Sequence, residues 1–189
     1  LRAEPPDEAA RAELTREVAG LEERAGSGDR LPEDPAEPGR AVLERLNAAV
    51  RDAAMDGGLR ELRARAHLAL ARHAAAAGRT AQPHASAALF DLVEAARREG
   101  GRADTLLRLA AAHRILALDA VECGADPEVD FRQALADLDS ALPLGVDMAG
   151  VLEERAWIQF FQAEWRAAAG ENPGEALRAA EQDLDRVLA

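Results

Sequence analysis

The chain has 189 residues, and its composition already excludes several classes of protein. Its 35 acidic residues against 23 basic ones give a net charge of −12, whereas nucleic-acid-binding domains carry a basic face. Alanine, leucine, arginine and glutamate dominate and favour helices, while runs of β-branched residues are lacking, so we expect an all-α fold. Every basic residue is arginine, which is typical of a GC-rich, bacterial-type genome.

The first expected pair of helices occupies about residues 7–57, and only its second half has a clear pattern. Glycines and a proline interrupt the apolar spacing before residue 30. Asp34-Pro35 then offers an aspartate N-cap followed by proline at the first helical position, with Glu37 in the capping-box position. We expect Gly57-Gly58 to end the second helix of this pair.

Three further pairs of helices are expected at about 58–103, 104–149 and 150–189. Their long first helices are predicted near 59–77, 104–123 and 150–169. Each of these is followed by a glycine, the residue that most readily takes the left-handed conformation that ends a helix. Asp126-Pro127 and Asn172-Pro173 predict where the second helices of the last two pairs begin.

The same pattern recurs every 46 residues without a gap. Gly78 is followed at this interval by Gly124 and Gly170. The second helices carry a small, a large and a small residue at i, i+4 and i+7, and the large residue is always leucine. These leucines are Leu46, Leu92, Leu138 and Leu184, and we expect Leu92, Leu138 and Leu184 to be buried at equivalent places.

The small–large–small spacing resembles the second-helix signature of the tetratricopeptide repeat, over about residues 7 to 189. Ala64, Ala110 and Ala156 resemble the small residue of that family's first helix. The usual unit of the family has about 34 residues, so this chain looks like a variant with longer helices. The resemblance implies an α-α superhelix, a right-handed solenoid of about four helical hairpins in a single domain of residues 1–189.

Motifs for catalysis or cofactor binding are not found in the sequence, which has no glycine-rich phosphate loop, no HExxH and no serine elbow. We therefore expect no enzyme activity, no cofactor and no bound metal. His67 and His113 are equivalent residues of adjacent repeats, which helix packing places roughly 10 Å apart. We expect no two histidines within ligand distance of one metal. An enzyme or metal-binding protein that uses His67, His113 and nearby acids is an alternative.

Recurring acidic residues on the second helices could suggest acid–base catalysis. They are Asp91, Asp137 with Asp139, and Asp183 with Asp185. Residues two apart on a helix do not face each other. We interpret these acids as part of a solvated outer face.

Two groups of residues are candidates for binding a partner. Trp157, Phe160, Phe161 and Trp165 form one stripe of the last long helix, which either packs inside the repeat or is an exposed binding site. Arg60 and Arg63, with further arginines nearby, could hold a carboxylate or an acidic peptide. The alternative for these arginines is pairing inside the chain with Glu61, Glu94 and other acids.

The function expected from these features is a protein–protein interaction scaffold or a regulatory module of a larger multidomain protein. Its partner is expected to be a protein, a peptide or an adjacent domain of the parent chain, and not nucleic acid or a membrane. A structural self-assembly module is the alternative. We expect an apolar surface at Leu184, Val187 and Leu188 to stay partly exposed, with part of the aromatic stripe, as the docking face.

Location and completeness are also expectations at this point. The sequence has no run of 18 apolar residues that would form a transmembrane helix. It begins with Leu-Arg-Ala-Glu-Pro-Pro, which does not have the pattern of a signal peptide. We therefore expect a cytoplasmic protein, and the lack of an initial methionine indicates a piece of a longer one.

Overall fold

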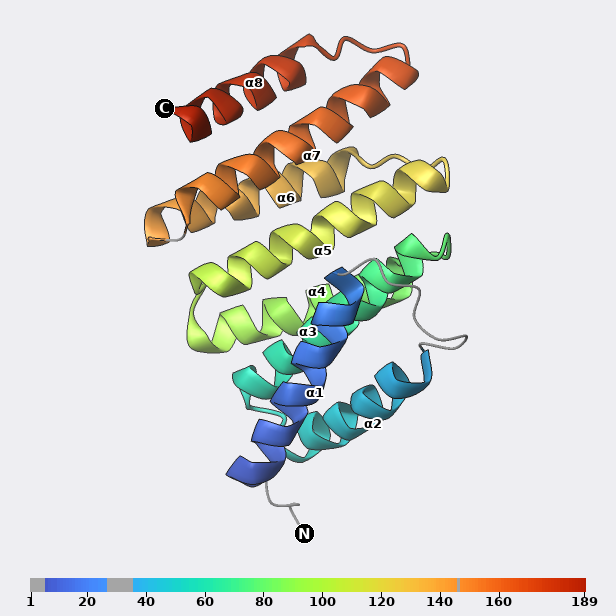
Figure 1. Ribbon diagram of the computed structural model, residues 1–189, viewed down its shortest axis with the longest axis vertical. Coiled ribbons are helices and arrows are strands. Elements are labelled where there is room, and N and C mark those ends of the chain that lie inside the picture. The colour runs from blue at the N-terminus through green and yellow to red at the C-terminus, as the bar shows by residue number, and fades with distance from the viewer. Residues whose placement is uncertain (1–5, 27–35, 146) are drawn as a thin grey trace. The chain divides into compact units, whose positions relative to one another are not determined.

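The computed structural model describes residues 6–26, 36–145 and 147–189. Eight α-helices and one short 3-10 helix lie within these ranges, which contain no strand (Figure 1). The all-α fold expected from the composition is therefore confirmed. The chain divides into two compact units, Leu1–Gly101 and Arg102–Ala189. Their boundary falls close to the expected border between the second and third repeats, and the two units are described separately.

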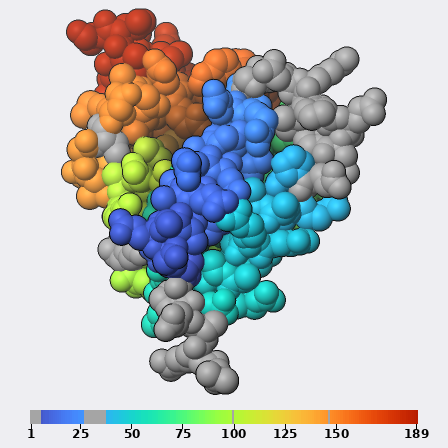
Figure 2. Space-filling model, turned by 60° about the horizontal axis from the view of Figure 1, so that its bottom comes forward, coloured from blue at the N-terminus to red at the C-terminus, as the bar shows by residue number. Residues whose placement is uncertain are grey.

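Unit 1 contains α1 (Glu8–Gly26), α2 (Ala36–Asp52), α3 (Gly57–Ala76) and α4 (Gln82–Glu99). The long helix α3 is central, because α1, α2 and α4 all pack against it. Figure 2 shows α1 and α2 side by side on the surface of this unit. The expected hairpin at residues 7–57 is therefore only partly formed, since α1 packs more extensively on α3 than on α2. The core joins residues of α1, α2 and α3, among them Val18, Leu46, Leu59 and Ala66.

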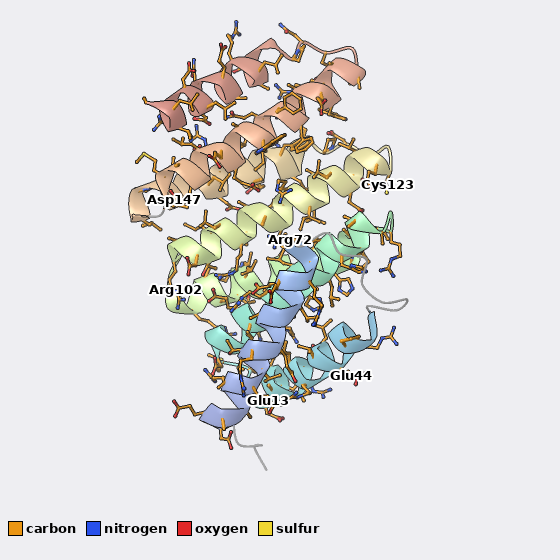
Figure 3. The ribbon with its side chains drawn as sticks, in the orientation of Figure 1. Glu13, Glu44, Arg72, Arg102, Cys123 and Asp147 are labelled. Carbon is orange, nitrogen blue, oxygen red and sulfur yellow. The ribbon has the colours of Figure 1, made fainter. Side chains whose placement is uncertain are left out.

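Unit 2 contains α5 (Ala103–Glu122), α6 (Glu128–Ala141), the 3-10 helix η1 (Leu142–Leu144), α7 (Met148–Ala168) and α8 (Gly174–Leu188). Helices α5 and α6 pack together, as do α7 and α8, and α7 also packs on α6. The labelled Cys123 and Asp147 mark the end of α5 and the start of α7 in Figure 3. The core is built from α5, α6 and α7, among them Ala110, Phe131, Leu138 and Ile158.

The ends of the helices repeat with the interval found in the sequence. The second helices α2, α4, α6 and α8 begin at residues 36, 82, 128 and 174. The long helices α3, α5 and α7 end at residues 76, 122 and 168, within two residues of the predictions. Gly78, Gly124 and Gly170 have φ values of 65°, 72° and 78°. The residue after each glycine donates its N–H back to the last helical turn, as Ala125 does to the Ala120 carbonyl at 2.8 Å.

The boundary between α2 and α3 differs from the expected one. Gly57 and Gly58 do not end α2, which stops at Asp52; they form the first turn of α3 instead. Asp56 caps this turn, because its Oδ1 accepts the N–H of Leu59 at 2.9 Å. The expected cap at Asp34-Pro35 lies outside the described residues.

The expectation that Leu92, Leu138 and Leu184 are buried is confirmed for the first two and wrong for Leu184. Leu46 and Leu92 are 0% exposed and Leu138 is 1% exposed, whereas Leu184 is 46% exposed. The physical reason is packing: α3 lies on α2 and α7 lies on α6, but α8 packs mainly against α7. One side of α8 therefore stays open in unit 2.

The two equivalent leucines of unit 2 give a direct test of this difference. Leu138→Ala should lower the free energy of unfolding by about 2–5 kcal/mol, because it leaves a cavity in a packed core. Leu184→Ala, the matched change on α8, should cost less than about 1 kcal/mol, because that side chain is already half in water. Urea denaturation followed by circular dichroism measures both. Equal losses would contradict the packing described for α8.

Candidate functional site

Two arginine–aspartate pairs occupy equivalent places in the two units. Arg63 of α3 donates from Nε and Nη2 to the carboxylate of Asp91 in α4, at 2.7 and 2.6 Å. Arg155 of α7 donates in the same way to Asp183 of α8, at 2.9 Å each. Asp91 is 1% exposed and Asp183 is 2% exposed. The interpretation of the recurring acids as a solvated outer face is therefore wrong for Asp91 and Asp183, each of which lies buried against the arginine 28 residues before it. It holds for Asp139 and Asp185, which are exposed.

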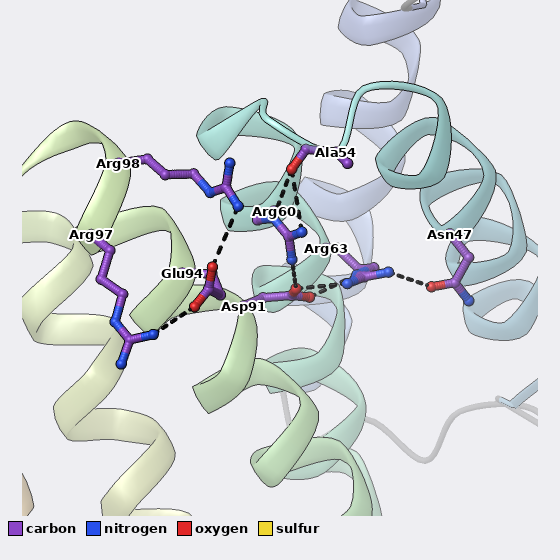
Figure 4. Close-up of polar contacts among 8 residues, drawn as sticks. All are labelled: Asn47, Ala54, Arg60, Arg63, Asp91, Glu94, Arg97 and Arg98. Carbon is purple, nitrogen blue, oxygen red and sulfur yellow. Dashed lines mark hydrogen bonds and ion pairs between the residues drawn. The ribbon is translucent and has the colours of Figure 1, made fainter. Parts of the chain in front are cut away.

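Each of these arginines also reaches back to the preceding helix. Nη1 of Arg63 donates to Oδ1 of Asn47 in α2 at 2.9 Å, as Figure 4 shows. Nη1 of Arg155 donates to Asp139 of α6, which is the equivalent of Asn47 in the 46-residue interval. A single planar guanidinium thus joins three helices in each unit, through the fixed fork of donors that distinguishes arginine from lysine.

Arg60 and Arg63, predicted as a partner-binding pair, are engaged within unit 1. Arg60 donates to Asp91 at 3.3 Å and to the Ala54 carbonyl at 3.3 and 3.4 Å (Figure 4). The alternative of intramolecular pairing therefore describes both arginines, with Asp91 as the acid in place of Glu61 or Glu94. Glu94 pairs with Arg97 and Arg98 in the same helix. Arg60 and Arg63 thus hold α2, α3 and α4 together.

The hairpin of α5 and α6 keeps the acid but not the arginine. Leu109 stands where the neighbouring repeats have Arg63 and Arg155, and among the described residues no arginine pairs with Asp137. Its Oδ2 is buried without a hydrogen bond, and the Nε2 of His113 lies 3.9 Å away. The other ring nitrogen of His113 is 3.1 Å from Oδ1 of Asp130. Burial raises the pKa of Asp137 from 3.8 to about 6, against the opposing effect of His113. This group can exchange a proton near neutral pH.

Two histidines of unit 1 lie in direct contact, which the sequence did not predict. The Nδ1 atoms of His67 and His84 are 3.1 Å apart, and the ring centroids are 5.4 Å apart. Burial and the neighbouring His84 lower the pKa of His67 to about 4, so the ring is neutral at physiological pH. The expectation that no two histidines come within ligand distance of one metal is therefore wrong. The described residues contain no group of three or more side chains able to hold a metal ion.

The aromatic stripe on α7 divides into a half-buried and an exposed part. Phe161 and Trp165 pack against the core of unit 2. Trp157 is 58% exposed and Phe160 is 39% exposed. The rings of Trp157, Phe160 and Phe161 contact one another, with centroids 6.0–6.2 Å apart. Both readings of the stripe, packing and exposure, therefore apply to different members of it.

The exposed half of the stripe joins the open side of α8 to form one apolar surface. A pocket of about 270 Å³ lies between the two helices, lined by Ala156, Trp157, Phe160, Ala180 and Leu184. Leu177 and Leu188 of α8 are also exposed, Leu188 most of all at 85%. This surface is called the α7–α8 face below; its exposed large residues are Trp157, Phe160, Leu177, Leu184 and Leu188. Sequence reasoning found its aromatic half, Leu184 and Leu188 but missed Leu177.

A second hollow lies in unit 1 between α1 and α2. Its volume is about 710 Å³, and charged side chains of both helices line it. Arg45 of α2 crosses it to pair with Glu13 at 3.3 Å and with Glu17 at 2.6 Å. Arg45 is thus engaged within unit 1, whereas the α7–α8 face leaves large apolar side chains exposed, which makes it the stronger candidate for a binding site.

Comparisons with protein-family models, with curated proteins and with solved structures found no match to this chain. None of the described helices combines the length and apolar character needed to cross a membrane. The site therefore has to be interpreted from its own geometry.

The buried carboxyl of Asp137 should make the stability of the protein depend on pH. Because the folded pKa of Asp137 lies above its unfolded value of 3.8, the folded state holds the proton more tightly. This contribution to stability is complete below about pH 4 and is lost as the pH rises through about 6. Asp137→Asn should remove that loss, so its unfolding free energy should exceed that of wild type at pH 7 by on the order of 1 kcal/mol. Urea titrations at pH 4 and pH 7 measure it.

The control for this change is Asp130→Asn, which alters the other acid beside His113. If both variants change the pH dependence equally, the effect belongs to the charge of the histidine and not to burial of Asp137.

The buried pair in the last hairpin should respond unequally to single and double changes. Asp183→Ala leaves the guanidinium of Arg155 with only the exposed Asp139, and it should cost about 3–5 kcal/mol. Replacing both Arg155 and Asp183 by leucine should cost less than the single change, because no buried charge is left unpaired. Asp139→Ala should cost about 1 kcal/mol or less, because that acid is exposed. Chemical denaturation of the three variants measures the order of their unfolding free energies. A double variant less stable than Asp183→Ala would contradict the expectation.

Proposed function

We propose that this chain is a protein-interaction module and that its α7–α8 face binds a protein partner. The observation that carries the proposal is the exposed apolar surface made by Trp157, Phe160, Leu184 and Leu188 in an otherwise acidic protein. The proposal includes a tetratricopeptide-like solenoid scaffold within a larger protein. The recurrence of helix ends every 46 residues supports that part.

The size and shape of the surface favour a protein partner over a small ligand. Small-molecule sites usually enclose about 300–1,000 Å³ and bury most of their ligand. The pocket between α7 and α8 is smaller, at about 270 Å³, and its rim is extended by exposed leucines. A pocket of this size accepts one or two side chains of a partner, while the surrounding apolar residues exclude water around them.

The composition of the surface points the same way. Exposed tryptophan and phenylalanine supply large contact areas, and tryptophan is enriched among the residues that dominate binding energy. Single exposed apolar side chains are ordinary, but a contiguous patch usually marks an interaction site. The negative charge of the chain favours a partner with a basic surface, since charge complementarity speeds the encounter.

The same face also supports self-assembly as a second candidate function. Apolar surface that binds another protein can bind a second copy of this chain, and the α7–α8 face would then lie at a dimer interface. Sedimentation velocity over a range of concentrations separates the two candidates. A dimer that Leu184→Ser abolishes would favour self-assembly.

Selection from a random peptide library tests the proposed function. Peptides selected on the wild-type chain should bind the double variant Trp157→Ser, Leu184→Ser about tenfold more weakly or worse, because the change removes the apolar walls of the pocket. Both side chains are half-exposed, so the helical circular dichroism signal should stay intact. Met55→Ser is the matched control, since Met55 is an exposed apolar residue of unit 1. Peptides that bind wild type and the double variant equally would contradict the proposal.

A further inference from the structure

The α7–α8 face repeats a surface that other helices of this chain already cover. Leu184 and Asp185 of α8 are the equivalents of Leu138 and Asp139 in α6, at an interval of 46 residues. The same register on α2 holds Leu46 and Asn47. Helix α7 packs on α6, and helix α3 packs on α2. The chain therefore contains two examples of what lies on this surface.

The two covering helices present the same three positions at i, i+4 and i+7: an apolar residue, an arginine and a second apolar residue. They are Leu59, Arg63 and Ala66 in α3, and Val151, Arg155 and Ile158 in α7. The apolar pair of α3 shares a core cluster with Leu46. The apolar pair of α7 shares a core cluster with Leu138.

The arginine between the two apolar residues meets the residue next to the repeat leucine. Arg63 donates to Asn47 at 2.9 Å, and Arg155 donates to Asp139. Asp185 holds this acceptor position on α8, where it is exposed and has no ion-pair partner in the described part of the chain. The acceptor for an arginine is thus present beside the open leucine.

The arginine occurs in the two helices that pack on a polar residue at this position: Arg63 lies on Asn47 and Arg155 lies on Asp139. An acidic residue at the same position of α8 therefore favours an arginine in the helix that covers it.

We propose that the α7–α8 face binds an amphipathic α-helix of another polypeptide, with an apolar residue at i, an arginine at i+4 and an apolar residue at i+7. The two apolar side chains cover Leu184, and the arginine donates to the carboxylate of Asp185. This inference rests on the proposed function, because it names the partner of the same face.

The α3 and α7 helices of a second folded copy do not offer this pattern. Both bury it: Leu59, Ala66, Val151 and Ile158 all lie in the cores of their own units. Presenting either helix to a neighbour would require that unit to open. Helix α1 exposes the same spacing only as Ala12, Arg16 and Ala19, whose two apolar side chains are single methyl groups. The proposed partner is therefore a helix that displays on its surface the arginine and at least one apolar side chain larger than alanine.

A peptide with the sequence of residues 57–76 is the probe, because it carries the pattern and is rich in arginine. Fluorescence anisotropy of the labelled peptide should show saturable binding to the 189-residue chain. Asp185→Arg should weaken it by about fivefold, the upper range for an ion pair at a surface. A peptide with Arg63→Asp should bind wild type as weakly and should regain affinity for Asp185→Arg. Glu175→Arg, the same charge change at an exposed position at the start of α8, should weaken binding by less than about twofold.

The outcomes distinguish failure of the arginine contact, of the helical partner and of the proposed function. Binding that Leu184→Ser removes but Asp185→Arg and Glu175→Arg affect equally would overturn the arginine contact and leave the proposed function standing. Binding that persists in Leu184→Ser would place the peptide elsewhere on the chain and overturn the inference. No peptide binding, with library peptides still bound at the α7–α8 face, would overturn the helix partner alone. A loss of both would overturn the proposed function as well.

Discussion

The buried guanidinium–carboxylate contact is the interaction on which the packing of each unit depends. Arg63 and Arg155 each place two parallel donors on an aspartate that has almost no contact with water. A carboxylate taken out of water loses several kcal/mol of solvation, which only good geometry and full hydrogen bonding recover. The pair therefore adds little net stability against an apolar replacement. What it does is fix which helices meet, and at which register, because the fork of the arginine fits one arrangement.

This constraint explains how alanine-rich helices find a defined arrangement. Small side chains let two helices approach closely but give few features that select one register over another. In unit 1 the remaining guanidinium nitrogen of Arg63, Nη1, donates to Asn47, so one side chain links α2, α3 and α4. In unit 2, Arg155 does the same for α6, α7 and α8. The polar contact supplies the specificity that the small apolar residues lack, as buried polar groups do in some other helical proteins.

Local features of the sequence predicted the helices well, because they act within a few residues. A glycine that takes a positive φ ends a helix through bonds to the preceding turn, and Gly78, Gly124 and Gly170 all do so. The long-range features were harder to predict. The contact of Asp91 with Arg63 spans 28 residues and that of His67 with His84 spans 17, so both depend on how two helices are packed. The signal was nevertheless present: Arg155 and Asp183 repeat the separation of Arg63 and Asp91, a coincidence that the interpretation of the acids as solvated overlooked.

Burial of the repeat leucines shows why a sequence repeat is not enough to predict a core. Leu138 and Leu184 both lie between two aspartates and follow an alanine four residues earlier, but α7 packs on the helix of Leu138, whereas α8 packs mainly against α7. A repeat predicts the chemistry that a surface prefers, while the neighbouring element decides whether the surface is covered. The variation inside this chain therefore carries information in both directions. An apolar Leu109 leaves Asp137 buried beside His113 with a raised pKa, and an acidic Asp185 leaves an acceptor open beside Leu184. Where the arginine is missing, the acid can exchange a proton or stays an open acceptor. Where the arginine is present, the residue at the same position is paired with it.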